Sequence, residues 1–141
     1  MRALSEDVFV AGQISPDQIE LLKEQGIVSI LNNRPDFEAP SQPTSDDLKI
    51  QIESTGLNYA FVPMAGGLSP DLIEKTVEAF NTLPRPILAF CASGTRSAAL
   101  WGFAHVKELG VDGVIGAMHG AGYNLEQIRG PLAQYLASVS E

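Results

Sequence analysis

The fold of this chain is decided by the stretch Ile87-Leu88-Ala89-Phe90-Cys91-Ala92-Ser93-Gly94-Thr95-Arg96-Ser97. Its first four residues are apolar, which predicts a central strand covered on both faces. Small residues follow and suit a tight loop before a helix. A strand that runs into such a loop gathers backbone N–H groups and the positive end of the helix dipole at one point. The stretch therefore predicts an anion-binding loop at the end of a central strand.

Cys91 is the only cysteine of the chain and the first residue of this loop. The positive field that binds an anion also stabilises a thiolate, so we expect a depressed pKa for Cys91. Arg96 adds a planar guanidinium that can hold an oxyanion with two hydrogen bonds. A buried structural cysteine is the alternative, because free cysteines are among the most buried residues. The loop and Arg96 favour a thiolate enzyme that acts on a small oxyanion or on sulfur.

The other loop residues suit the same task. We expect the anion-binding segment to comprise Ala92, Ser93, Gly94, Thr95, Arg96 and Ser97. Gly94 is expected to adopt a backbone conformation that other residues resist, or to let an anion approach the backbone. Ser97 can donate to the thiolate, and it can also serve as a helix-capping hydroxyl.

Strand and helix signals alternate on both sides of this stretch. Further apolar runs predict strands at 8–11, 27–31 and 59–62. Helix starts are expected at Ser15-Pro16-Asp17, Ser45-Asp46-Asp47 and Ser69-Pro70-Asp71, with Ser15 and Ser45 as capping hydroxyls. The helix after the loop is expected to end at Gly110, and the remainder to Glu141 is predicted to be mostly helical. This order predicts an α/β fold with a central, mainly parallel four-stranded sheet flanked by helices on both faces.

Ligands of parallel α/β sheets bind outside the carboxyl ends of the strands. Three loops follow predicted strands at that edge, namely residues 32–38, 63–67 and 91–97. We therefore expect these three loops to converge on one site.

Length and composition limit the class of protein. A chain of 141 residues predicts one domain over residues 1–141. The formal net charge of −8 argues against nucleic acid or an anionic membrane as partner. No apolar run approaches the roughly 20 residues of a membrane span, and no leader segment is visible at the N-terminus. A single free thiol suits a reducing compartment, so a cytoplasmic location is expected.

Cofactor motifs are not evident in the sequence. The two histidines and one cysteine are widely spaced and do not predict a metal site. The glycine spacing does not match a dinucleotide-binding fingerprint. We therefore expect no cofactor.

Several motifs are shared with a bacterial family. They are Asn33-Arg34-Pro35-Asp36, Gly56-Leu57-Asn58-Tyr59, Ser93-Gly94-Thr95-Arg96-Ser97, Leu100-Trp101 and Ala121-Gly122-Tyr123. Through them most of residues 5–137 resembles the phosphatase-like domain of beta-lactamase hydrolase-like proteins, which belongs to the protein tyrosine and dual-specificity phosphatase superfamily. The resemblance implies a phosphatase-like fold and a hydrolase of phosphorylated substrates. It also implies that Cys91 is the nucleophile and Arg96 the oxyanion clamp.

Two departures from the superfamily pattern leave alternatives open. Four residues separate Cys91 from Arg96 where the phosphatase signature has five, and the shorter loop resembles that of single-domain rhodaneses. The loop 64–68 also lacks the aspartate that dual-specificity phosphatases use as general acid. Asp71 and Asp36 are the candidate proton donors, although a helix first turn and a tight turn also account for them.

Three functions therefore remain open from the sequence. A phosphatase would carry a phosphoryl group on Cys91. A sulfurtransferase would take sulfur from a sulfane-sulfur donor and carry a Cys91 persulfide. A catalytically weak regulatory module would keep the anion site without turnover.

Overall fold

The computed structural model describes residues 1–139 and alternates strands with helices along the chain. Its elements are β1 (Arg2–Ala3), β2 (Val8–Ala11), α1 (Pro16–Glu24), β3 (Ser29–Asn32), α2 (Ser45–Ser54), β4 (Asn58–Phe61), α3 (Pro70–Thr82), β5 (Ile87–Phe90), α4 (Thr95–Gly120), the 3₁₀ turn η1 (Glu126–Ile128) and α5 (Arg129–Val139). The predicted helical stretch extends two residues further, to Glu141, and those two lie outside the described residues.

The strands form one sheet in the order β1-β2-β5-β3-β4. The pairs β2–β5, β5–β3 and β3–β4 are parallel, and β1 pairs antiparallel with β2. The predicted α/β fold with a mainly parallel sheet is therefore confirmed. The sheet has five strands rather than the expected four, because the two-residue β1 is too short to leave a hydrophobic pattern in the sequence.

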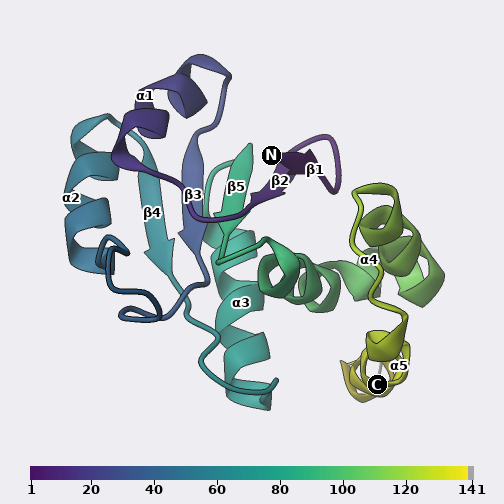
Figure 1. Ribbon diagram of the computed structural model, residues 1–141. Helices are drawn as coiled ribbons and strands as arrows, with labels where there is room; N and C mark the ends of the chain where they lie inside the picture. The colour runs from purple at the N-terminus through teal and green to yellow at the C-terminus, as the bar shows by residue number, and fades with distance from the viewer. Residues whose placement is uncertain (140–141) are drawn as a thin grey trace.

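The central strand β5 packs on both of its faces, as predicted. All four of its residues are buried. Ile87 and Ala89 join the core formed with α3, α4 and α5, whereas Leu88 and Phe90 join the core formed with α1 and α2. Side chains alternate between the two faces of a strand, so this continuous apolar run supplies both cores. Figure 1 shows α1 and α2 on one side of the sheet and α3, α4 and α5 on the other.

The helix starts follow the capping signals closely. Pro16 and Pro70 occupy the first turns of α1 and α3 after Ser15 and Ser69. The start of α2 differs from the expectation by one residue. Thr44, not Ser45, caps it and accepts a hydrogen bond of 3.2 Å from the backbone N–H of Asp47. Serine and threonine hydroxyls can both cap a helix, and in this fold Thr44 occupies the N-cap position of α2.

Gly110 interrupts the long helix α4 where the sequence predicted its end. Its φ of 78° and ψ of 165° are not helical, so α4 consists of two helical segments joined at this residue. Glycine accepts this left-handed conformation without the steric cost that a side chain adds. The second segment carries the chain toward η1 and α5 (Figure 1).

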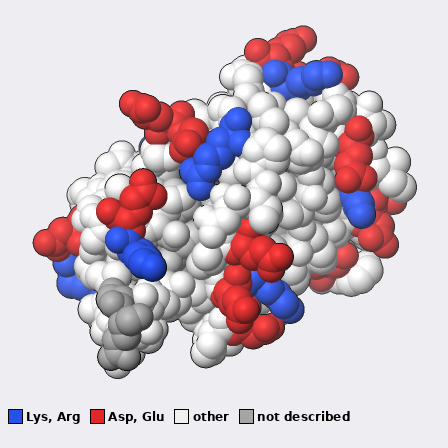
Figure 2. All heavy atoms as spheres, turned by 180° about the vertical axis from the view of Figure 1, so that it is seen from behind, with Lys and Arg blue, Asp and Glu red and all other residues white. Residues whose placement is uncertain are grey.

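On the face seen in Figure 2, charged side chains form a few small groups in which acidic and basic residues lie side by side, separated by uncharged surface. No helix within residues 1–139 combines the length and apolar character that crossing a bilayer requires.

Candidate active site

Cys91 directly follows β5 and is buried. The backbone N–H of Gly94 donates a hydrogen bond of 3.1 Å to its Sγ atom. Gly94 is the N-cap of α4 and has a φ of 95°. The thiol therefore faces the N-terminus of a long helix, where unpaired N–H groups and the helix dipole favour negative charge.

The surroundings of Cys91 lower the pKa of its thiol. Burial acts in the opposite direction, because it disfavours the charged thiolate. Hydrogen bonds from the backbone of Ser97, Ser93 and Gly94 outweigh burial, and the Ser97 side chain adds to them. The net effect favours the thiolate, which is the reactive form of cysteine.

Arg96 lies on the first turn of α4 and its guanidinium is held by a carboxylate. Its Nη1 and Nη2 atoms each donate to Glu38 at 2.8 Å, and Nη1 also donates to the backbone carbonyl of Met64 at 3.0 Å. The hydrogen bonds from Arg96 and Arg34 hold the pKa of Glu38 at about 2 against partial desolvation. Glu38 is therefore a permanent anion at neutral pH, and it orients the guanidinium without supplying a proton.

A closed ring of hydrogen bonds surrounds the cysteine loop. Arg34 donates from Nε to Glu38 at 3.0 Å and from Nη1 to the Gln13 side chain at 2.9 Å. The backbone N–H of Gln13 donates to the carbonyl of Ala92 at 3.3 Å. The pair between Glu38 and Arg96 completes the ring, which leaves the cysteine loop at Ala92 and returns to it at Arg96. It joins segments that follow three different strands.

Asn33 ties the strand ends together beneath the loop. It is fully buried, and its Nδ2 atom donates to the carbonyl of Val62 at 2.9 Å. Its backbone N–H donates to the carbonyl of Phe90 at 2.8 Å. The Ser97 hydroxyl donates to Asn33 Oδ1 at 2.8 Å. Together with the Arg96 bond to Met64, these contacts bring together the three loops that the sequence predicted to converge.

Tyr123 covers the outer side of the loop. Its hydroxyl donates to the carbonyl of Ser93 at 3.3 Å. Burial raises the pKa of Tyr123, and the nearby Cys91 raises it further. A Cβ atom added to Gly94 would overlap the Tyr123 hydroxyl. Position 94 therefore favours glycine for its backbone conformation, and a side chain there would also displace Tyr123 or the loop.

The two candidate proton donors lie outside this ring. Asp71 is exposed on the first turn of α3, pairs with Lys75 at 3.2 Å, and lines a shallow hollow beside the loop 63–67. Asp36 accepts a hydrogen bond of 2.8 Å from the backbone N–H of Ser45 at the start of α2. Each carboxylate thus has a structural partner, and its role as proton donor stays a prediction.

Sequence reasoning missed Glu38, Gln13 and the positioning role of Asn33. Glu38 is 58 residues from its partner Arg96 in the sequence, so no local pattern connects them. The only signal was that Asn33 and Glu38 belong to a loop expected at the same edge of the sheet. Within residues 1–139, no group of three or more histidine, cysteine or acidic residues is arranged to hold a metal ion.

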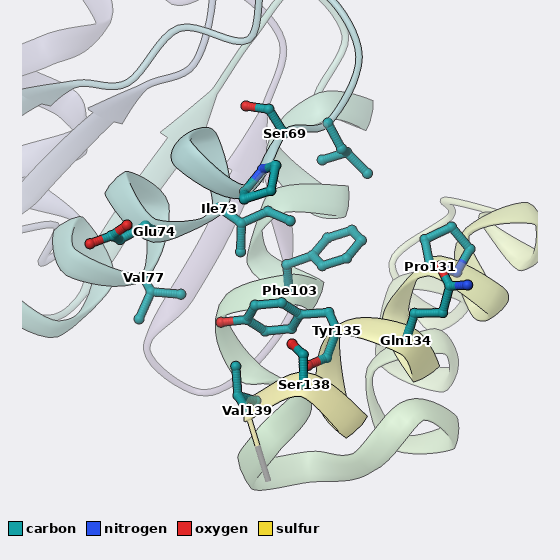
Figure 3. A pocket seen from close by; sticks show the side chains of 12 residues that line it. Ser69, Ile73, Glu74, Val77, Phe103, Pro131, Gln134, Tyr135, Ser138 and Val139 are labelled. Carbon is teal, nitrogen blue, oxygen red and sulfur yellow. The ribbon is translucent and has the colours of Figure 1, made fainter. Parts of the chain in front are cut away.

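A separate hollow of about 550 Å³ lies between α3, α4 and α5. Figure 3 shows Phe103 and Tyr135 beside each other in it, with Ile73 and Val77 contributed by α3. The lining includes none of the residues of the cysteine loop. This hollow is therefore distinct from the site around Cys91.

Comparison with known families agrees with the resemblance found in the sequence motifs. Residues 1–107 match the model of the family described as "Beta-lactamase hydrolase-like protein, phosphatase-like domain". The chain is 33% identical over 102 residues to a beta-lactamase hydrolase-like protein of Agrobacterium fabrum, a match that covers 70% of this chain and 23% of that protein. The chain thus spans about a quarter of the length of the curated relatives it matches.

Solved structures share the fold over nearly the whole chain. A candidate phosphatase of Neisseria meningitidis is 31% identical and superposes with a TM-score of 0.81, covering 95% of this chain and 96% of that one. A candidate phosphatase of Shewanella putrefaciens is 15% identical with a TM-score of 0.75, covering 97% of this chain and 90% of that one. The fold predicted from the sequence, including its phosphatase-like character, is confirmed by these likenesses.

Proposed function

The chain belongs to the family of phosphatase-like domains of beta-lactamase hydrolase-like proteins, and from this membership we propose that it is a cysteine-dependent phosphatase of the cytoplasm. Cys91 is the nucleophile, and the segment Ala92–Ser97 with Arg96 binds the oxyanion. The substrate is a phosphorylated small molecule or another ester of a small oxyanion.

One observation carries this proposal: Cys91 is the only cysteine of the chain, and the backbone N–H of Gly94 at the N-terminus of α4 donates to its Sγ atom at 3.1 Å. The backbone N–H groups of Ser97 and Ser93 also lower the pKa of the thiol. The same N–H groups can receive the equatorial oxygens of a phosphoryl group. Arg96 lies close enough to Cys91 for the thiolate to raise the pKa of the guanidinium, after the larger contribution of Glu38. Nucleophile, donors and cation therefore share one small space.

The proposed reaction has two steps. The Cys91 thiolate forms an S–P bond while the P–O bond to the leaving group breaks, and the leaving oxygen receives a proton. Asp71 and Asp36 are the candidate donors of that proton. Water then forms a P–O bond, the S–P bond breaks, and phosphate leaves with the thiolate regenerated. Loop N–H groups and Arg96 stabilise the charge in both steps.

A specific observation favours a second candidate, sulfur transfer. The loop has only four residues between Cys91 and Arg96, and residues 64–68 include no acid. Thiolate attack on the sulfane sulfur of thiosulfate forms an S–S bond, and sulfite leaves with the electron pair without needing a proton. The Cys91 persulfide then transfers its outer sulfur to a thiolate or cyanide acceptor. The regulatory module without turnover is the third candidate.

One preparation distinguishes the three candidates. It is assayed with an aryl phosphate and with thiosulfate plus cyanide, alongside Cys91→Ser and the exposed control Ile50→Ala. Phosphate release that is lost in Cys91→Ser and kept in Ile50→Ala supports the phosphatase. Thiocyanate formation with the same mutational pattern, and a mass increase of one sulfur on Cys91, support sulfur transfer instead. Oxyanion binding without either product supports the regulatory module.

A further inference from the structure

One peptide unit of the cysteine loop connects Cys91 with Tyr123. The backbone N–H of Gly94 donates to Cys91 Sγ at 3.1 Å, and the carbonyl of Ser93 accepts from the Tyr123 hydroxyl at 3.3 Å. That N–H and that carbonyl belong to the same peptide unit. In a planar trans peptide the two groups point in opposite directions, so the hydroxyl that holds the carbonyl also determines where the N–H points.

The conformation of Gly94 is one of two that a tight turn allows at this position. Its φ of 95° and ψ of −16° are close to those of the third residue of a type II turn. A type I turn differs by a rotation of the preceding peptide unit and places the same residue at a φ of about −90°. In that orientation the N–H of Gly94 would leave the sulfur, and the carbonyl of Ser93 would turn toward it.

The preceding peptide unit of the loop is secured by backbone groups. The carbonyl of Ala92 accepts from the backbone N–H of Gln13 at 3.3 Å. A Cβ atom added to Gly12 would lie 2.9 Å from the same oxygen, so the segment after β2 packs closely against it. The carbonyl of Ser93 depends instead on a side chain, which comes from the turn after α4 and lies 30 residues away in the sequence.

Tyr123 is itself held in place on both sides. Its ring packs against Gly94, where an added Cβ would lie 2.9 Å from the ring atom Cζ. The Arg2 guanidinium lies against Gly122, where an added Cβ would be 3.3 Å from Nη1. Burial raises the pKa of Tyr123 and the nearby Cys91 raises it further, whereas Arg2 lowers it. The net rise keeps the proton on the hydroxyl, which therefore remains a donor when the thiolate forms.

We propose that Tyr123 is a positioning residue for the nucleophile: its hydroxyl holds the Ser93–Gly94 peptide unit with the N–H toward Cys91 and the carbonyl away from it. This proposal rests on the proposed function only in the role of Cys91 as nucleophile, and it applies equally to attack on phosphorus and on sulfur. The same N–H is one of the donors available to an oxyanion bound by the loop. Loss of the hydroxyl should therefore weaken both the thiolate and the binding of an oxyanion.

The decisive variant is Tyr123→Phe, which removes the hydroxyl and keeps the ring. The rate of Cys91 alkylation by iodoacetamide is followed against pH, and its midpoint reports the pKa of the thiol. We expect the midpoint to rise by about 0.3 to 1 pH unit, because one neutral hydrogen bond corresponds to about a two- to tenfold change in an equilibrium. Tyr135→Phe removes a hydroxyl from the separate hollow between α3, α4 and α5 and should leave the midpoint unchanged. Arg96, the cation beside the thiol, is present in both variants.

A second measurement removes the thiolate from the comparison. The Kd for sulfate is measured by calorimetry in Cys91→Ser, with and without Tyr123→Phe. We expect the Kd to increase by about two- to tenfold when the hydroxyl is absent, because the anion loses a donor whenever the peptide unit rotates. A hydroxyl that served only packing would change the melting temperature of the anion-free protein and leave this Kd as it was.

The outcomes separate this proposal from the proposed function. An unchanged alkylation midpoint in Tyr123→Phe, or an equal rise in Tyr135→Phe, overturns the positioning role. A raised midpoint with an unchanged Kd for sulfate also overturns it, because the N–H of Gly94 would then still face the site. If the wild type hydrolyses no ester while both readouts respond to Tyr123→Phe, the phosphatase proposal fails and the positioning role stands. If ester hydrolysis is found and neither readout responds, the reverse holds.

Discussion

Two buried titratable side chains of this protein each lie next to an arginine, with opposite consequences. Cys91 lies beside Arg96 at the carboxyl edge of the sheet. His105, a residue of α4, lies beside Arg85, which precedes β5. The pKa of each is lowered. For the thiol a lowered pKa means that the charged form is favoured, whereas for the imidazole it means that the neutral form is favoured.

The difference arises from what the protein offers to each charge. Around Cys91, backbone N–H groups donate to the sulfur and overcome the effect of burial. Around His105, burial is the largest cause of the lowered pKa, and Arg85 adds to it by repulsion. The carbonyl of Trp101 can only accept, so His105 Nδ1 carries the proton, and Nε2 accepts from Arg85 at 3.1 Å. One arginine thus accompanies a thiol whose charged form is favoured, and the other an imidazole whose neutral form is favoured.

The largest expected effect is the difference in turnover between variants of the two arginines. Arg96→Ala should lower turnover by about 100- to 1,000-fold, the range for loss of one preorganised donor to a developing charge, and should abolish the rise in melting temperature caused by sulfate or vanadate. Arg85→Ala should cost about 1 kcal/mol of stability through its lost hydrogen bonds, with turnover unchanged. Steady-state kinetics and thermal unfolding measure both. Equal stabilisation by sulfate in wild type and Arg96→Ala would contradict the anion site.

Gly94→Ala should reduce turnover by about 100-fold, because displacing catalytic groups by about 1 Å has effects of that size. The added Cβ meets the Tyr123 hydroxyl, so either the Tyr123 ring or the loop that holds Cys91 must shift, and the left-handed φ strains the loop in addition. Gly110→Ala is the matched control, since Gly110 also has a positive φ but nothing within 4 Å of the added Cβ. Both variants should lose some stability through backbone strain. If the two lose activity equally, the contact with Tyr123 has no role in the loop.

The cysteine loop was predictable because its signals are local. The apolar run of β5, the small residues after it and Arg96 lie within 11 consecutive residues. The helix starts at Ser15 and Ser69 were predictable for the same reason, since a capping serine precedes a proline.

Contacts between distant segments were not predictable in this way. Glu38 and Asn33 act through partners 58 and 64 residues away, and β1 exists only through pairing with β2. The contact of His105 was not predictable either. Its position in a helix predicts packing, but not the hydrogen bond with Arg85, which lies 20 residues earlier in the sequence. These features depend on contacts between segments that are far apart in the sequence, so local sequence patterns could not predict them.

The pH dependence of Cys91 alkylation tests whether the pKa of the thiol is lowered, and the expected effect is smaller than those of the preceding variants. The rate of reaction with iodoacetamide should rise with a midpoint below about 8.5, the value of a free thiol, because the loop N–H groups favour the thiolate. Ser97→Ala should move the midpoint upward, since the Ser97 hydroxyl contributes to the lowered pKa. Thr82→Ala, a distant hydroxyl on α3, serves as control. A wild-type midpoint at or above 8.5 would falsify the thiolate assignment.

The smallest effect concerns His105 and appears in the pH dependence of stability. In the unfolded chain a histidine takes up its proton near pH 6.5, whereas in the fold the pKa of His105 is lower. As the pH falls below about 6.5, the unfolded state binds the proton first, so stability is lost until the pH reaches the folded pKa. Above that window His105 contributes no pH dependence. One proton limits the slope to about 1.4 kcal/mol per pH unit.

Urea unfolding between pH 7.5 and 5 measures this slope in wild type and in His105→Gln. The variant should be less stable at pH 7.5, because the ring stacks on Trp101 with centroids 5.0 Å apart, but its stability should fall less as the pH is lowered. Asp7 and Glu108 oppose Arg85 at His105 and moderate the slope. Parallel pH profiles for wild type and His105→Gln would mean that the imidazole is not held neutral, and the contrast with Cys91 would then rest on the thiol alone.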